Sequence, residues 1–107
     1  MKFTASPIAG VWLIEVEKSA DDRGFFARTQ CVAEFTARGL HGLFRQSSIS
    51  YNQRRGTLRG MHYQIAPHPE PKLLRCTAGR IHDVIIDLLP DSASYLQHFA
   101  EIGRAHV

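Results

Sequence analysis

The sequence predicts a mainly β domain, either a β-sandwich or a barrel, with one short helix. About seven short segments carry apolar or alternating patterns, and turn signals separate them about every ten residues. A chain of 107 residues has room for one hydrophobic core. Its hydrophobic content of 44% and charged content of 21% are those of an ordinary globular protein. We therefore expect a single small β domain.

Four elements are predicted in the first part of the chain. Val11–Glu17 is rich in β-branched and aromatic residues, which indicates a strand. Asp21–Gly24 is a predicted turn, because Asp and Gly supply local hydrogen bonds and a positive φ. Phe25–Thr29 is a second short strand. A helix is predicted over Val32–Arg38, and Gly39 is placed to cap its carboxyl end.

Strand signals continue in the second part of the chain. Phe44–Tyr51 alternates, but its apolar signal is weak, which fits a strand lining a polar cavity. The strongest strand pattern covers Arg80–Leu89. The other predicted strands are Leu58–Gln64, Lys72–Thr77 and Tyr95–Ile102.

Composition argues against several classes of protein. No apolar run approaches the roughly 20 residues of a membrane span, and the first residues lack the apolar core of a signal peptide. The sequence therefore predicts a cytoplasmic protein with no membrane partner. A net charge of +3 suits a small anionic substrate and is too weak to indicate nucleic acid. The basic residues Arg54, Arg55 and Arg59 also lack interleaved aromatic side chains.

Cys31 and Cys76 belong to no Cys-x-x-Cys motif and are expected to be free thiols.

The candidate chemistry centres on Gly56–Gln64, which contains the predicted strand Leu58–Gln64 and has two glycines, Gly56 and Gly60, before its histidine. His62 is either a structural histidine bonded to a neighbour or a proton-transfer base that a ligand approaches closely. Lys72 is either a solvated lysine at a strand edge or, facing a barrel interior, a donor to an oxyanion. Asp83 is the candidate to orient the histidine or lysine, and its ordinary alternative is a surface carboxylate.

Strict strand alternation places Arg59 and His62 on opposite faces. A bulge at Gly60 would re-phase the strand and let both side chains reach one pocket. The residues alone leave the two arrangements open.

The spacing also resembles the first motif of the cupins. Gly56 is followed after five residues by His62, and Lys72 precedes Gly79 by six residues. The second histidine of the motif is Gln64 here, and its glutamate is Lys72. Because a protonated lysine does not ligate a divalent metal, we expect no metal, and His62 is left free for acid–base chemistry.

The chain resembles the dTDP-4-dehydrorhamnose 3,5-epimerase family and related dTDP-4-keto-6-deoxyhexose epimerases. The ordered match runs from about Gly10 to Phe99. The matching segments are Asp22–Phe26, Gln46 with its following polar residues, Arg55–Gln64, Lys72–Arg75 and Gly79–Asp87.

This resemblance implies a fold and a reaction. The fold is a cupin-like double-stranded β-helix, a jelly-roll barrel, here partial and with one short helix. The reaction inverts C3, C5 or both in a dTDP-4-keto-6-deoxyhexose, within rhamnose-type deoxysugar and cell-surface polysaccharide biosynthesis. No cofactor is implied, because the 4-keto group of the substrate acidifies the neighbouring C–H bonds. The full-length protein is expected to be a homodimer.

The resemblance also implies roles for single residues. His62 is the general base, and Lys72 stabilises the enolate oxygen. Arg23 and Arg59 hold the phosphates. The substrate pocket is further lined by Phe26, Gln46, Ser47 and Ser48.

Two departures concern specificity. Arg28 stands where the family often has a glutamate, and Ser48 where it often has an asparagine. These departures leave open which 4-keto sugar is the substrate and how many of its centres are inverted.

The resemblance also predicts a division of the chain. Residues 10–100 are expected to be the N-terminal part of a single cupin-like epimerase domain. Residues 101–107 match a translated sequencing adapter and are expected to be a non-native tail. The alternative function is an inactive fragment or a non-catalytic cupin module that binds a nucleotide-sugar or another anion.

Overall fold

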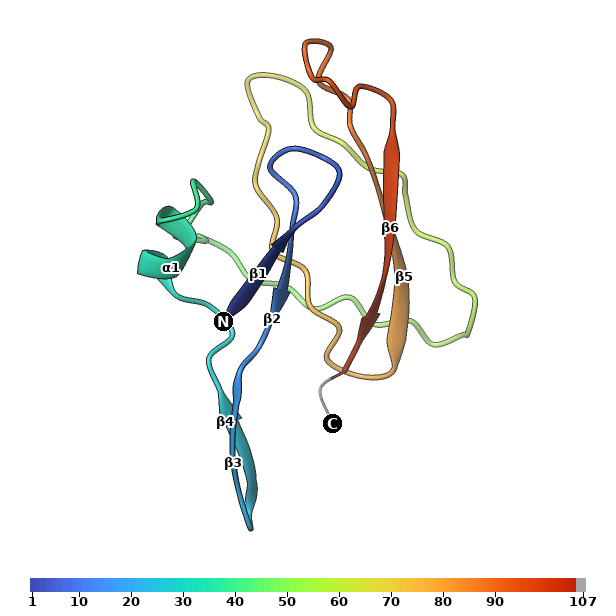
Figure 1. Cartoon of the computed structure of the whole chain (residues 1–107). Coiled ribbons are helices and arrows are strands. Elements are labelled where there is room, and N and C mark those ends of the chain that lie inside the picture. The colour runs from blue at the N-terminus through green and yellow to red at the C-terminus, as the bar shows by residue number, and fades with distance from the viewer. Residues whose placement is uncertain (106–107) are drawn as a thin grey trace.

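The computed structural model describes residues 1–105, which form six strands and one short helix (Figure 1). The prediction of a mainly β domain with one short helix is confirmed. No helix within residues 1–105 is both long and apolar enough to cross a membrane. The elements are β1 (Lys2–Ala5), β2 (Trp12–Glu15), β3 (Lys18–Asp21), β4 (Gly24–Ala27), α1 (Val32–Thr36), β5 (Arg80–Ile86) and β6 (His98–Arg104).

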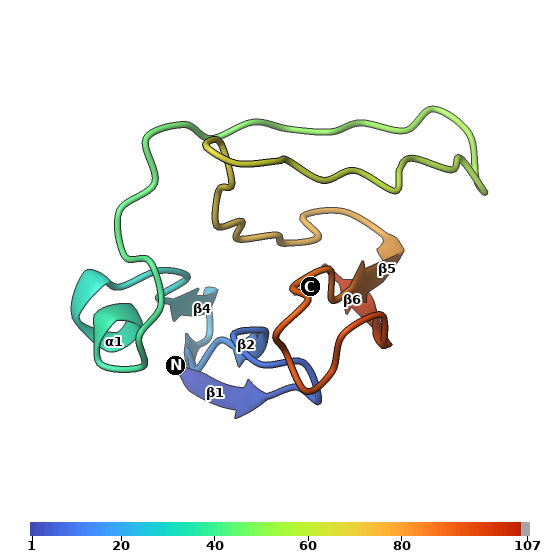
Figure 2. The same cartoon turned by 90° about the horizontal axis from the view of Figure 1, so that it is seen from above.

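The strands pair as three antiparallel hairpins, β1–β2, β3–β4 and β5–β6. Phe3 lies opposite Ile14 in the first hairpin, and Asp83 lies opposite Glu101 in the third. Each sheet has two strands, so each strand has one edge without a ladder among residues 1–105. Seen from above, the β1–β2 and β5–β6 hairpins lie near one another (Figure 2).

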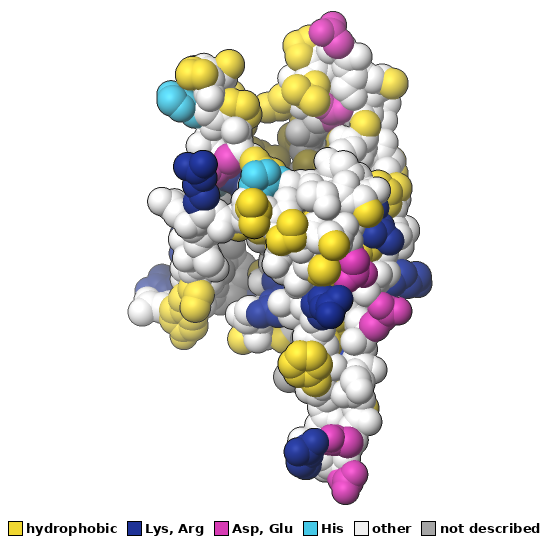
Figure 3. All heavy atoms as spheres, turned by 90° about the vertical axis from the view of Figure 1, so that its left-hand side faces the viewer, with side chains coloured by type: hydrophobic (Ala, Val, Ile, Leu, Met, Phe, Trp, Pro, Cys, Tyr) yellow, Lys and Arg dark blue, Asp and Glu magenta, His cyan; other side chains and the backbone are white. Residues whose placement is uncertain are grey.

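The β3–β4 hairpin projects as an arm and ends in charged side chains (Figures 1 and 3). Its turn is closed at Asp21, whose Oδ1 accepts the backbone N–H of Arg23 at 2.9 Å. Gly24 has a φ of +134°, a conformation that glycine adopts without strain. The turn predicted over Asp21–Gly24 is therefore confirmed.

The helix ends as predicted at a glycine cap. Gly39 has a φ of +69°, and its N–H donates to the carbonyl of Thr36 at 3.0 Å. The N–H of Leu40 donates to the carbonyl of Phe35 at 3.0 Å, which completes a Schellman motif. The regular helix is shorter than predicted, because the N–H of Arg38 already bonds to the carbonyl of Phe35, three residues back.

The core is a small cluster where α1 meets β1. Phe35 is 2% exposed, and its ring lies edge-to-face with the rings of Phe3 at 5.7 Å and Phe44 at 6.4 Å between centroids. Ile8 and Cys76 are the other buried apolar side chains of residues 1–105. Cys76, like Cys31, is a free thiol, as predicted.

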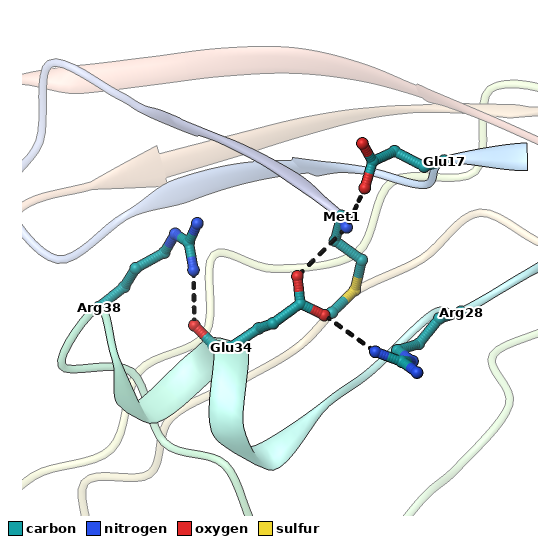
Figure 4. A network of polar contacts seen from close by, with 5 residues as sticks. All are labelled: Met1, Glu17, Arg28, Glu34 and Arg38. Atoms are coloured by element: carbon teal, nitrogen blue, oxygen red, sulfur yellow. Dashed lines mark hydrogen bonds and ion pairs between the residues drawn. The ribbon is translucent and has the colours of Figure 1, made fainter.

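A polar network joins the start of β1 to the helix (Figure 4). The α-ammonium of Met1 bonds to the carboxylates of Glu17 and Glu34, the latter at 3.3 Å. Arg28 Nη1 donates to Glu34 Oε2 at 3.5 Å, and Arg38 Nη1 donates to the Glu34 carbonyl at 2.8 Å. The Glu17 carboxylate raises the pKa of the α-amine, and the α-amine lowers the pKa of Glu34. Glu34 is thus the residue through which β1, α1 and the segment after β4 are held together.

Three predicted strands do not form. Phe44–Tyr51, Leu58–Gln64 and Lys72–Thr77 are without a ladder, and residues 44–75 run as an exposed, open loop on one side of the molecule (Figures 1 and 2). Alternation favours an extended backbone, but a ladder also needs a partner strand alongside. Within residues 1–105 no such strand is paired with these segments.

The expected tail takes part in the third hairpin. Glu101 and Ile102 of β6 pair with Asp83 and His82 of β5. The N–H of Ala105 donates to the carbonyl of Gly79 at 3.0 Å. Residues 106–107 lie outside the described residues.

The loop between β5 and β6 is built around a buried carboxylate. Asp87 is 5% exposed and accepts hydrogen bonds from Ser92 Oγ at 2.5 Å, Ser94 Oγ at 2.6 Å and the Leu89 N–H at 2.9 Å. The Ser92 and Ser94 hydroxyls and the Leu89 N–H favour the ionised form and lower the pKa of Asp87.

We expect Asp87→Asn to lower the melting temperature at neutral pH by a few degrees. Since the folded-state pKa lies below the ordinary value of 3.8, the charge of Asp87 stabilises the fold above about pH 4. That contribution is lost as the pH falls through the lowered pKa. The wild-type melting temperature should therefore fall more steeply on acidification than that of the variant. Asp91→Asn removes an exposed carboxylate from the same loop and is the control. Equal acid dependence of wild type and Asp87→Asn would contradict this role.

Candidate functional site

The residues predicted to form the site lie at three separate places. Gln46, Ser47 and Ser48, together with Arg59, His62 and Lys72, belong to the open loop between α1 and β5, and all six are exposed. Arg23 and Phe26 belong to the projecting β3–β4 hairpin, and Asp83 is half-buried on β5.

Arg59 is held by a turn of the open loop. Its Nε donates to Asn52 Oδ1 at 2.7 Å, and its Nη2 donates to the Tyr51 carbonyl at 3.1 Å. Thr57 Oγ1 closes the turn by donating to the carbonyl of Arg54 at 2.8 Å. Sequence reasoning missed Asn52, although its place in the polar turn seven residues before Arg59 is visible in the sequence.

A hollow of about 420 Å³ opens at this turn. Among the described residues, neither Arg54 nor Arg59 has a carboxylate partner within ion-pair distance. Two arginines without a carboxylate partner among the described residues therefore line one hollow, which is an arrangement suited to an oxyanion. Its lining consists of Tyr51, Asn52, Gln53, Arg54, Thr57 and Arg59.

His62 lies two residues after Gly60, which has a φ of +98°. A Cβ at residue 60 would lie 3.6 Å from His62 Nδ1, so the imidazole lies beside the position that a side chain at residue 60 would occupy. His62 lines neither of the two hollows described here, and Leu58–Gln64 forms no ladder. The re-phasing of a paired strand at Gly60 is therefore not seen, and Arg59 turns instead toward Asn52.

Lys72 lies beside a carboxylate. Its Nζ is 3.7 Å from Glu70 Oε1, and both side chains are about half exposed. Exposed pairs of this kind contribute little to stability, so the ammonium is free to exchange Glu70 for another anion.

Phe26 and Arg23 lie on the β3–β4 hairpin and not on the open loop that carries Arg59, His62 and Lys72. Phe26 is 80% exposed and lies at a second hollow of about 350 Å³, with Arg75 on its wall. Arg23 Nη2 bonds to Asp21 Oδ2 at 2.5 Å at the tip of the arm. The Asp21 pKa is lowered chiefly by this guanidinium. The second hollow is lined by Val16, Phe25, Phe26, Ala27, Thr29, Arg75, Cys76 and Thr77.

Asp83 makes no side-chain hydrogen bond to His62 or Lys72 within the part of the chain that the structure describes. Residues 1–105 also contain no group of three or more His, Cys, Asp or Glu side chains that could hold a metal ion.

Comparison with known proteins identifies one family. A family model described as dTDP-4-dehydrorhamnose 3,5-epimerase matches residues 5–104. A curated dTDP-4-dehydrorhamnose 3,5-epimerase of Methanothermobacter thermautotrophicus is 38% identical over 94 residues, which are 88% of this chain and 50% of the relative. That of Pseudomonas aeruginosa is 36% identical over 101 residues, 94% of this chain and 55% of the relative. The chain thus spans about half the length of the curated relatives it matches.

A solved structure of the Bacillus anthracis dTDP-4-dehydrorhamnose 3,5-epimerase, with TDP and PPi bound, matches with a TM-score of 0.91 at 34% identity. The match covers 97% of this chain and 59% of that chain. The predicted cupin-like fold is therefore confirmed.

Proposed function

Because the chain belongs to the dTDP-4-dehydrorhamnose 3,5-epimerase family, we propose that it acts in the inversion of C3, C5 or both in a dTDP-4-keto-6-deoxyhexose. The observation that carries the proposal is that two arginines without a carboxylate partner among the described residues, Arg54 and Arg59, line one hollow on the same loop as His62. The guanidinium groups suit the diphosphate, and the histidine suits proton transfer. The product belongs to rhamnose-type deoxysugar and cell-surface polysaccharide biosynthesis.

The proposed chemistry needs no cofactor. The 4-keto group acidifies the hydrogen on C3 or C5, and His62 removes that hydrogen as a proton. The electron pair of the broken C–H bond moves into the enolate. The Lys72 ammonium leaves Glu70 and stabilises the enolate oxygen. Water then delivers a proton to the opposite face of the ring, which completes the inversion, and His62 releases the proton it removed to the solvent. Asp83 is the candidate to orient the base or the lysine.

Substrate binding is proposed for Arg23 and Arg59 at the phosphates. The nucleotide and sugar are proposed to contact Phe26, Gln46, Ser47 and Ser48. Arg23 and Phe26 belong to the projecting arm rather than to the loop that carries His62, and the three hairpins leave strand edges open among residues 1–105. Both features favour a homodimer, in which a second copy covers the edges. The cytoplasmic location stays a prediction.

A second candidate is a binding module without turnover. It is favoured by the Glu70–Lys72 contact and by the absence, within residues 1–105, of a carboxylate bonded to His62. Such a module would bind a nucleotide-sugar through the arginines and leave its C–H bonds intact.

Hydrogen exchange separates the two functions. We expect the protein in heavy water to introduce deuterium at C3 or C5 of dTDP-4-keto-6-deoxyglucose, as measured by proton NMR. dTDP-glucose, which lacks the keto group, is the control and should not exchange. Binding of both nucleotide-sugars without deuterium uptake would replace the epimerase by the binding module.

A further inference from the structure

We propose that Asn52 is a positioning residue, which fixes the guanidinium of Arg59 so that its free edge faces the diphosphate of the nucleotide-sugar. This inference rests on the proposed function, in which Arg59 binds phosphate.

The geometry of the guanidinium carries the inference. Arginine has five N–H donors on a rigid planar group. The Nε–H of Arg59 is used by Asn52 Oδ1 at 2.7 Å, and one Nη2–H is used by the Tyr51 carbonyl at 3.1 Å. Both contacts engage the side of the guanidinium that carries Nε. One N–H of each Nη then remains on the outer edge, and these two N–H groups form the fork that donates to two oxygens of a phosphate.

The two partners lie just before a turn of the open loop. The turn is closed by Thr57 Oγ1, which donates to the Arg54 carbonyl at 2.8 Å. An exposed arginine otherwise samples many rotamers, and that freedom must be lost when a ligand binds. Asn52 restricts it before binding.

The chemistry of the amide also matters. An amide oxygen accepts the Nε–H without adding a negative charge, so Arg59 keeps its full charge for the ligand. Among the described residues Arg59 and its neighbour Arg54 have no ion-pair partner, and both line the hollow of about 420 Å³. A carboxylate in place of Asn52 would hold the guanidinium but compete with the phosphate.

The test is titration of the protein with TDP by calorimetry, using Asn52→Ala, Arg59→Ala and the double variant. We expect Asn52→Ala to weaken TDP binding about tenfold, because the guanidinium is no longer held. In the Arg59→Ala background the same change should alter affinity less than about twofold, because Asn52 acts only through Arg59. Ser50→Ala, an exposed residue outside both hollows, is the control and should bind as the wild type does.

A spectroscopic measurement tests the contact without ligand. The Nε–H signal of Arg59 in a proton–nitrogen spectrum should move upfield and exchange faster in Asn52→Ala than in wild type, because its hydrogen bond is lost. An unchanged signal would overturn the inference.

The outcomes separate the inference from the proposed function. Weak binding by Arg59→Ala, with wild-type affinity in Asn52→Ala, would overturn the positioning role and leave the phosphate role of Arg59 intact. Additive losses in the double variant would likewise overturn it. The proposed phosphate site itself would be overturned if the wild type did not bind TDP, or if Arg59→Ala bound TDP as tightly as the wild type. The Nε–H signal would then decide whether Asn52 holds Arg59.

Discussion

Replacing His62 by alanine is expected to reduce deuterium uptake into dTDP-4-keto-6-deoxyglucose by about 10²–10⁴-fold, the usual contribution of a positioned general base. The imidazole lies beside Gly60 on the loop that also carries Arg59. Removing it takes away the proposed proton acceptor, whereas the arginines proposed to bind phosphate remain. We therefore expect TDP affinity to stay within about twofold of wild type.

The matched control is His68→Ala, which removes an imidazole from an exposed position six residues further along the same loop. The deuterium uptake measured with His68→Ala should equal that measured with the wild type. Undiminished uptake in His62→Ala would show that another group takes the proton. Equal losses in both variants would point to a general disturbance of the loop.

Phe35→Ala is expected to lower the free energy of unfolding by about 3–5 kcal/mol. The Phe35 side chain is 2% exposed and contacts the rings of Phe3 and Phe44 in a core with few other buried apolar residues. The cavity would therefore remove the contact that joins α1 to β1. Urea unfolding followed by circular dichroism measures the change, and in a marginally stable chain it would appear as loss of the cooperative transition.

Two further variants keep this expectation testable. Phe35→Leu retains most of the apolar volume and should cost clearly less than Phe35→Ala. Phe26→Ala removes an aromatic ring that is 80% exposed and should change stability by less than about 0.5 kcal/mol. Similar losses in Phe35→Ala and Phe26→Ala would show that the helix–strand cluster is not the core.

Local signals in the sequence were sufficient for the parts of the fold that local chemistry determines. The Asp21–Gly24 turn and the Gly39 cap follow from positive φ and short-range hydrogen bonds, and both are present. Arg80–Ile86 forms from a strong β-branched run. In contrast β3, with the sequence Lys-Ser-Ala-Asp, has no strand pattern and forms because β4 folds back on it.

The site was less predictable, because it depends on which segments lie side by side. Strands were predicted over Phe44–Tyr51 and Leu58–Gln64, but neither segment has a partner strand among the described residues. The partners of Arg59 and Lys72 are Asn52 and Glu70, neighbours along the chain rather than across a barrel. Such contacts depend on the shape of a loop, which hydrophobic periodicity does not encode.

The two-stranded hairpins determine how the backbone is shielded from water. In an antiparallel pair, successive N–H groups of a strand point alternately toward the partner and away from it. About half of the amide protons of β5 and β6 therefore face outward, and they exchange with solvent deuterons without any unfolding, however stable the domain is. Among the described residues, the hydrogen-bonded amides include the inward-pointing amides of the hairpins and amides of the α1 region, such as Leu40. In this chain, amide exchange reports strand pairing more directly than it reports global stability.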